Sequence, residues 1–203
     1  NSGSITFDTT DGSSIGGFTF NTVTVSANKT MTGDWTCAGL LTIDSGATLT
    51  TGTNALTANA GLTANGTLDA TSQVVTVDPT AVTGNLSGSG SASFGAGALT
   101  VTGSCSLATV TAGAGTIDID GDLSGTAFTA GAGALTVNGN VSTATFTGGA
   151  GAIDIDGAVT SATGFTASST TTAVGANFTP GAFTHNSGSI TFDTTDGSSI
   201  GGF

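Results

Sequence analysis

The sequence predicts an all-β protein, a parallel β-solenoid with three-sided rungs of about 18 residues, where a rung is one turn of the solenoid. The motif Gly-Ala-Gly-Ala-Leu-Thr-Val begins at Gly95, and related motifs begin at Gly113, Gly131 and Gly149, so that the step is constant (113 − 95 = 18). Apolar and polar residues alternate within each motif, which is typical of a β-strand. No segment of helical length has an apolar period of 3.6 residues.

The 18-residue step places similar side chains above one another. We expect four apolar ladders: Leu99, Ile117, Leu135 and Ile153; Val101, Ile119, Val137 and Ile155; Cys105, Leu123, Val141 and Val159; and Val110, Phe128 and Phe146, with Phe165 one residue late. A glycine recurs at Gly103, Gly121, Gly139 and Gly157, which suits a corner with positive φ or close backbone packing. Each rung divides into three sides of similar length, each with a short strand and a corner.

The first half of the chain fits this pattern less regularly. The tripeptides at 5–7, 23–25 and 41–43 recur at the same step, and we assign them to the Leu99 position together with residues 56–58 and 75–77. The longer step from Val75 to Leu99 predicts a loop or bulge around Pro79 and Gly84–Gly90. Lys29 then falls at the Cys105 position, where a lone buried ammonium would be costly, so we expect the register to shift there. Trp35 and Phe183 are assigned to the phenylalanine ladder.

A second, longer period contains the first. Residues 1–18 return unchanged as residues 186–203, and the offset is the difference between the two starting positions (186 − 1 = 185). We interpret residues 1–185 as one repeat and 186–203 as the first rung of the next identical repeat. Ten rungs then fill one repeat, which is about 48 Å long at the spacing of β-strands. We expect residues 190–192 at the same position as residues 5–7, so that rungs can continue from one repeat into the next.

Composition excludes several classes of function. The net charge is −12, with one lysine and no arginine, so no basic surface exists for nucleic acid or for an anionic membrane. No apolar run approaches the ~20 residues that span a bilayer. A trypsin-like protease finds almost no site to cut, which suits a protein outside the cell.

The rungs from Gly95 to about Phe165 resemble the Gly/Ala/Thr-rich β-solenoid repeats of microbial surface proteins, such as filamentous adhesins and autotransporter passengers. The resemblance implies an extracellular or cell-surface location and a structural or adhesive role, and it carries no site residues. We therefore expect a structural protein that builds a filament, stalk or sheath by self-association with further copies of its repeat. The alternative is the stalk of a surface adhesin.

Aspartates form the one candidate metal site. Its candidate ligands are Asp118, Asp120, Asp122, Asp154 and Asp156. Oxygen-rich sites of this kind suit Ca²⁺, the only cofactor that the sequence suggests. The spacing matches neither an EF-hand nor the calcium-binding nonapeptide. A solvated acidic stripe is the simpler interpretation, because the Thr136-Val-Asn138 rung between the two Asp rungs separates like charges.

Other features suggest remote alternatives. Outward threonine columns, such as Thr6, Thr24 and Thr42, are a feature of ice-binding solenoids, and parallel β-helices also include polysaccharide-acting enzymes. No catalytic residue can be named, since His185 stands alone, and we expect no enzymatic activity. Glycans are conceivable at five N-glycosylation sequons: Asn28, Asn65, Asn85, Asn140 and Asn177. Cys37 and Cys105 lie about four rungs apart, too far for a disulfide.

Overall fold

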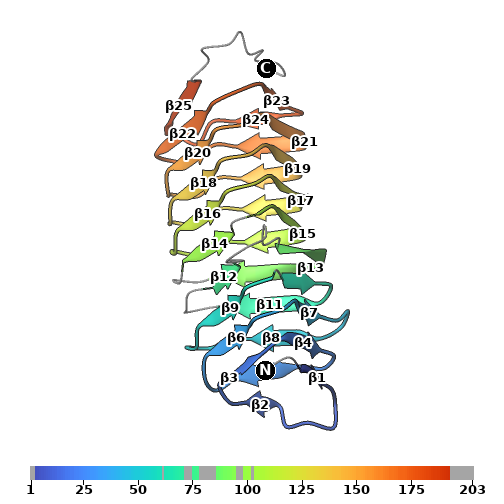
Figure 1. Cartoon of the computed structure of the whole chain (residues 1–203). Helices are drawn as coiled ribbons and strands as arrows, with labels where there is room; N and C mark the ends of the chain where they lie inside the picture. Colours follow the sequence, from blue (N-terminus) through green and yellow to red (C-terminus); the bar gives the residue numbers. More distant parts are fainter. Residues whose placement is uncertain are drawn as a thin grey trace.

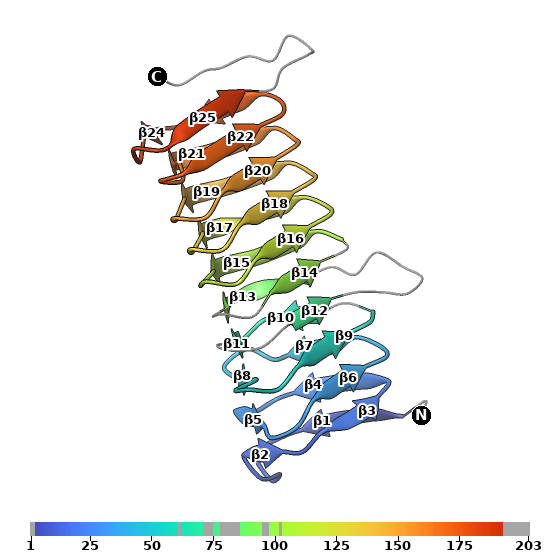
Figure 2. The ribbon, with the colours of Figure 1, turned by 90° about the vertical axis from the view of Figure 1, so that its left-hand side faces the viewer.

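The chain forms a β-solenoid of parallel strands with about nine turns, as the sequence predicts. In this computed structural model the described residues are 3–60, 62–70, 75–77, 86–94, 98–101 and 103–192, and within them every regular element is a strand. The strands are stacked in one column from β1 (Ser4–Phe7) to β25 (Ser189–Phe192) (Figures 1 and 2). One 15-stranded sheet covers two sides of the column, and a 10-stranded sheet covers the third.

Side 1 and side 2 belong to the larger sheet. Side 1 comprises β1, β4 (Thr22–Val25), β7 (Leu41–Ile43), β10 (Leu62–Ala64) and β23 (Phe178–Pro180). Side 2 comprises β2 (Ser14–Ile15), β5 (Lys29–Met31), β8 (Thr48–Thr50), β11 (Thr67–Ala70) and β24 (Phe183–Thr184). Five long strands run along side 1 and then side 2: β13 (Leu86–Phe94), β15 (Cys105–Thr111), β17 (Leu123–Thr129), β19 (Val141–Thr147) and β21 (Val159–Thr166).

Side 3 is the smaller sheet. It comprises β3 (Phe18–Phe20), β6 (Trp35–Cys37), β9 (Leu56–Ala58), β12 (Val75–Val77), β14 (Leu99–Val101), β16 (Ile117–Ile119), β18 (Leu135–Val137), β20 (Ile153–Ile155), β22 (Thr171–Val174) and β25. Ten strands therefore stack on each side, and the predicted three-sided rung is confirmed.

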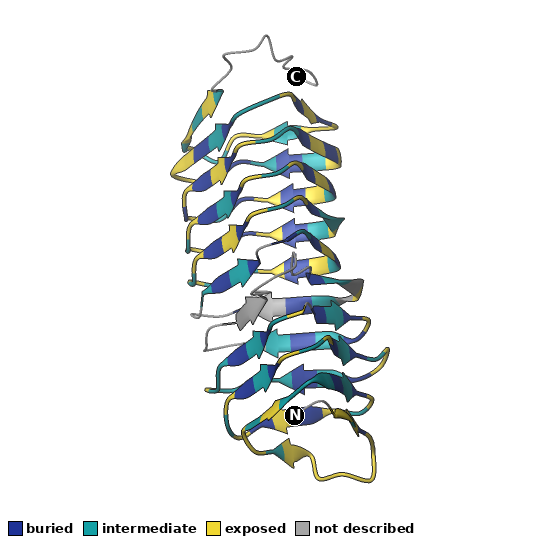
Figure 3. Cartoon of the chain, viewed as in Figure 1, coloured by how far each residue is buried: buried dark blue, intermediate teal, exposed yellow. Residues whose placement is uncertain are grey.

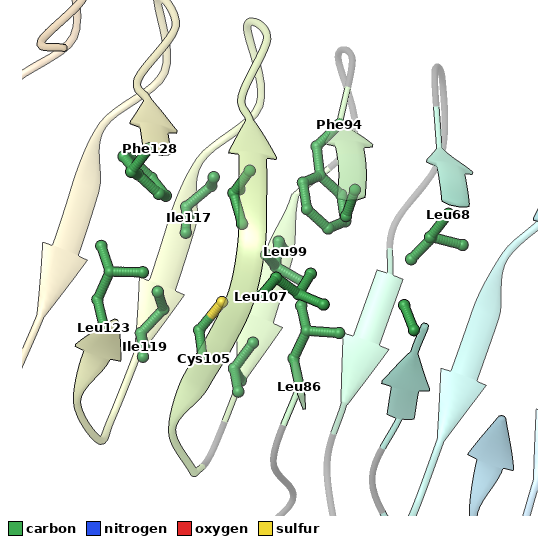
Figure 4. Close-up of a cluster of buried hydrophobic side chains, with 14 of the residues drawn as sticks. Leu68, Leu86, Phe94, Leu99, Cys105, Leu107, Ile117, Ile119, Leu123 and Phe128 are labelled. Atoms are coloured by element: carbon green, nitrogen blue, oxygen red, sulfur yellow. The ribbon is translucent and has the colours of Figure 1, made fainter. Parts of the chain in front are cut away.

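The core is a single apolar column inside the three sides. Alternate residues of strands such as β7, β14, β16 and β18 point inward and are buried, as the stripes of Figure 3 show. Figure 4 shows Leu86, Cys105 and Leu123 from side 1 facing Leu99 and Ile117 from side 3. The buried apolar residues form one cluster that extends from Phe7 to Phe178. Every part of the stack that these residues occupy is thus stabilised by burial of apolar surface.

The ladders predicted for the second half of the chain are confirmed. Leu99 pairs with Ile117, and Cys105 pairs with Leu123. The one-residue delay at Phe165 is a bulge in β21, because Thr143 pairs with Ser161 whereas Phe146 pairs with Phe165. A register shift in β13 between Gly88 and Ser91 agrees with the bulge expected near there. The rest of that predicted loop, residues 78–85, lies outside the described residues.

The register predicted for the first half of the chain is wrong in one respect. Val23 and Leu41 lie on side 1, in the ladder that leads to Cys105, and the Leu99 ladder lies on side 3. Leu56 continues side 3 by pairing with Trp35. The unusually short step from Leu41 to Leu56 is therefore a change of side. An apolar-Thr-apolar tripeptide suits any side equally well, so its sequence does not identify the side.

Two further assignments are corrected. Lys29 lies on side 2 in the ladder of Leu49, so the register does not shift to avoid it. Its side chain is buried, with 3% exposed. Trp35 lies on side 3 next to Phe18, whereas Phe183 does follow Phe165 in the phenylalanine ladder.

The duplicated segment occupies two different sides. Ile5 pairs with Val23 on side 1, whereas its copy Ile190 pairs with Thr172 on side 3. Nine rungs separate β1 from β23 on side 1, and β25 lies two sides further along. The 185-residue offset therefore spans nine and two-thirds rungs, where the sequence predicted ten. The expectation that both copies share one position is wrong.

Candidate functional surfaces

Side 1 carries an unbroken outward column of hydroxyl groups. Adjacent members are paired in register from β1 to β23, for example Ser106 with Ser124 and Ser142 with Thr160. The ten members are Thr6, Thr24, Thr42, Thr63, Ser87, Ser106, Ser124, Ser142, Thr160 and Thr179. Side 1 thus presents a narrow uncharged strip along the whole stack.

Side 2 carries threonines in pairs. Thr109 and Thr111 point outward from β15, and Thr145 and Thr147 point outward from β19. The strand between them adds Thr129, with Ala127 in place of the first threonine. Hydroxyl groups repeat about every 4.8 Å along the axis in the column of Thr111, Thr129 and Thr147, and the two threonines of β15 and of β19 are about 6.8 Å apart along the strand. Sequence reasoning found the threonine column of side 1 and missed this two-dimensional array, because it assigned no outward residues to side 2.

Side 3 and its following corner hold the candidate calcium ligands. Thr136 lies between Asp118 and Asp154 in the stack, so these carboxylates are two strand spacings apart, about 10 Å. All five aspartates are exposed. Among the described residues, no group of three or more His, Cys, Asp or Glu side chains comes together in a way that could hold a metal ion. Calcium binding at these residues stays an alternative to the solvated acidic stripe.

Asparagines in the intervening rung bind the aspartates of the rung before it. The Asn138 amide donates to Asp120 Oδ1 at 3.1 Å, and the Asn140 backbone N–H donates to Asp122 Oδ1 at 2.7 Å. The side-chain oxygen of Asn140 in turn accepts from the backbone N–H of Ala158 at 2.9 Å. These contacts use carboxylate lone pairs to hold neighbouring corners together, which is a structural role.

Lys29 is the only lysine of the chain, and the chain has no arginine. Its Nζ donates to the carbonyl oxygens of Asp8, Asp11 and Gly12 at 2.6, 3.1 and 3.2 Å. All three ammonium protons thereby have acceptors, which removes the penalty that the sequence suggested. The pKa of the Asp8 carboxyl is lowered, mainly by the hydroxyl and backbone N–H of Thr10, with a smaller contribution from the charge of Lys29.

The two cysteines are free and buried, on different sides of the solenoid. Their expected lack of a disulfide with each other is confirmed. Burial raises the pKa of both thiols to about 12. Both cysteines are buried residues of the core. Because a neutral thiol is neither a nucleophile nor a metal ligand, we assign them a packing role.

Aromatic rings gather near the N-terminal end and in the C-terminal half of the solenoid, where Phe128, Phe146 and Phe165 stack in succession. Near the N-terminal end, Phe7 lies 5.5 Å from Phe18 and 5.4 Å from Trp35, measured between ring centroids. Near the C-terminal end, Phe178 lies 5.4 Å from Phe192. We call these groups the N-terminal cluster (Phe7, Phe18, Phe20 and Trp35) and the C-terminal cluster (Phe165, Phe178, Phe183 and Phe192).

The remaining candidates lie apart from one another. His185 is exposed beside Phe183, with the ring centroids 6.5 Å apart. Four sequon asparagines are exposed: Asn28, Asn65, Asn140 and Asn177. The fifth, Asn85, lies outside the described residues.

Comparisons with known proteins give no relative. No family model matches the chain, and neither a curated protein nor a solved structure resembles it significantly. In the part of the chain that the structure describes, no helix is long and apolar enough to cross a membrane.

Proposed function

We propose that this chain is part of a structural protein, in which tandem repeats continue one β-solenoid into an extracellular filament, stalk or sheath. One observation carries the proposal. The segment that restarts the long period is not separated from the solenoid by a linker, because its strand β25 pairs in register with β22 over four residues. A new copy of the repeat thus begins as one more strand of the existing stack.

The mechanism of such a protein is mechanical. Backbone hydrogen bonds run parallel to the axis from strand to strand, for example from Leu123 N–H to Asn140 O at 2.8 Å and from Val141 N–H to Ala158 O at 2.8 Å. Pulling along the axis loads many such bonds together, while the apolar ladders keep water out of the core.

The extracellular location rests on composition. The chain has a single lysine and no arginine, and its net charge is −12. Its buried backbone and scarcity of basic residues would suit an environment rich in trypsin-like proteases. Immunogold labelling of intact source cells would test this location. Label inside the cells alone would contradict it.

The length of engineered arrays tests the structural role. Chains with one, two and three copies of the 185-residue repeat should give rods in small-angle X-ray scattering, each copy adding about 46 Å, or nine and two-thirds strand spacings of about 4.8 Å. Copies that behave as beads on flexible linkers would contradict the proposal. The stalk of an adhesin is the alternative, and it would require a distinct ligand-binding domain at an end of the full-length protein.

Ice binding is a second candidate, favoured by one observation. The threonine pairs of β15 and β19 on side 2 present hydroxyl and methyl groups in two columns on a β-sheet, with Ala127 between them in the first column. Thermal hysteresis measurements on the purified chain test it. A Thr147→Leu variant should lose any activity and a Ser142→Leu variant on side 1 should keep it. An unmodified chain without ice shaping or hysteresis excludes this candidate.

A further inference from the structure

We propose that consecutive repeats are joined with a rotation of one third of a turn, because β25, the first strand of the next repeat and the copy of side-1 strand β1, continues side 3 of the repeat before it. The edge of β25 would then bind the residues of the next copy that correspond to β4 (Thr22–Val25). This inference rests on the proposed continuation of rungs and adds the geometry of the joint.

Backbone pairing at the two ends supports the shared strand. The sequence Ser-Ile-Thr-Phe of β1 binds β4 with Ile5 beside Val23 and Phe7 beside Val25. The same four residues in β25 lie on β22 with Phe192 beside Val174. A strand of a parallel sheet has two edges. β1 pairs with the strand that follows it in the stack, and β25 pairs with the strand that precedes it. One strand can therefore make both pairings at once.

The route of the chain into β25 supports the same conclusion. Only residues 185–188 connect β24 on side 2 to β25 on side 3. Ser187 has a positive φ of 65°, and the backbone N–H of Ser189 donates to Thr170 O at 2.7 Å. Placing Ser189 on side 1 instead, as in β1, would require these few residues to pass over the whole of side 3.

The aromatic clusters give an independent reason for the joint. Phe7 belongs to the N-terminal cluster, and its copy Phe192 belongs to the C-terminal cluster. If β25 serves as β1 of the next repeat, Phe192 becomes a member of both clusters, which then merge into one buried aromatic core at every joint. Half-buried Phe18 and Phe192 would be covered by this contact.

Because of the rotation, each face of the filament carries the outward residues of a different side in consecutive repeats. Side 3 of one repeat is continued by side 1 of the next, so the hydroxyl column of side 1 moves one side around the axis at every joint. The faces return to their starting positions after three repeats, which contain 29 rungs (3 × 9⅔ = 29). A surface that binds a partner on one side would therefore follow a helix along the filament.

Disulfide trapping tests the position of β25 in the present chain. The pair Ala173→Cys/Thr191→Cys should oxidise readily, because these outward residues are side by side on neighbouring strands, within the Cα distance of a disulfide. The pair Ser142→Cys/Thr160→Cys is a matched positive control. The pair Thr179→Cys/Thr191→Cys should stay reduced. Its oxidation in preference to the first pair would place β25 on side 1 and overturn the inference.

Labelling of a long array tests the rotation itself. Gold bound to a Ser142→Cys variant marks side 1 of each repeat, since Ser142 is exposed and the native cysteines are buried. Labels that turn by one third of a turn per repeat along a continuous rod support the inference. Labels along one face of a continuous rod overturn it and leave the proposed function standing. Separate beads contradict both.

Discussion

Lys29 Nζ donates a 2.6 Å hydrogen bond to the backbone carbonyl oxygen of Asp8, on the loop that follows the first strand. The same ammonium also holds the carbonyls of Asp11 and Gly12. The single lysine thus ties the loop between β1 and β2 to the buried interior of side 2. The loop is thereby fixed to the strand of the next rung on side 2.

Replacing Lys29 with methionine should therefore destabilise the chain. The three carbonyl oxygens lose their buried donor, and we expect the free energy of unfolding to fall by about 1–3 kcal/mol. Urea denaturation followed by circular dichroism measures the change. Thr30→Ala, at an exposed neighbour on the same strand, is the control and should stay within about 0.5 kcal/mol of wild type. Equal effects of the two substitutions would contradict this role of Lys29.

Replacing a glycine with alanine should change the free energy of unfolding in opposite directions at different corners, depending on how closely the neighbouring rung approaches that glycine. A Cβ at Gly133 would overlap the carbonyl of Gly115, whereas a Cβ at Gly16 would meet nothing within 4 Å. Gly133→Ala should cost about 1–3 kcal/mol through overpacking. Gly16→Ala should leave stability unchanged or raise it by up to about 1 kcal/mol. The urea midpoints of the two variants measure this, and a stabilising Gly133→Ala would contradict the corner geometry.

The Cys105 thiol should be inert while the solenoid is folded. Its raised pKa, about 12, keeps it neutral at pH 9, and burial excludes reagent. Iodoacetamide at pH 9 should alkylate it only after denaturation, as read by mass spectrometry. The raised pKa also stabilises the folded state fully below the unfolded value near 9.0, and this contribution is lost as pH rises towards 12. Rapid alkylation of the native chain would contradict the buried position.

Calcium should have little effect on stability. A rung of threonine and asparagine separates Asp118, Asp120 and Asp122 from Asp154 and Asp156, and the five form no converging set among the described residues. We expect the same melting temperature in millimolar Ca²⁺ as in chelator. A higher melting temperature in Ca²⁺ would contradict this expectation, because a ligand that binds the folded state stabilises it. If Asp120→Asn abolished that increase and Asp44→Asn did not, the metal would bind at the acidic stripe.

The sequence was most informative where rungs have one length. From Leu99 to Ile155 the step is constant, so ladders and corners follow directly, and the pairing confirms them. It misled where rung length varies. Leu41 and Leu56 carry the same apolar-Thr-apolar pattern, yet they lie on different sides, because alternation is a local property and the side depends on every residue count before it.

The same limit explains the other corrections. Lys29 appeared unfavourable inside the solenoid because its acceptors are backbone carbonyls, which no sequence pattern displays. The two positions of the duplicated segment could not be read from its identical letters, since each copy takes the side on which the preceding chain leaves it. Of the candidate sites, the sequence identified the acidic stripe and one hydroxyl column, and it missed the paired threonines of side 2.

Cryo-electron microscopy of an array of many repeats tests the central claim most directly. If each repeat continues the solenoid of the one before, the images will show an unbroken rod with strands stacked about every 4.8 Å and a chemical repeat of about 46 Å along the axis. Interruptions of the strand stack at every copy of the Asn1–Phe18 segment, with variable angles between separate solenoids, would contradict it.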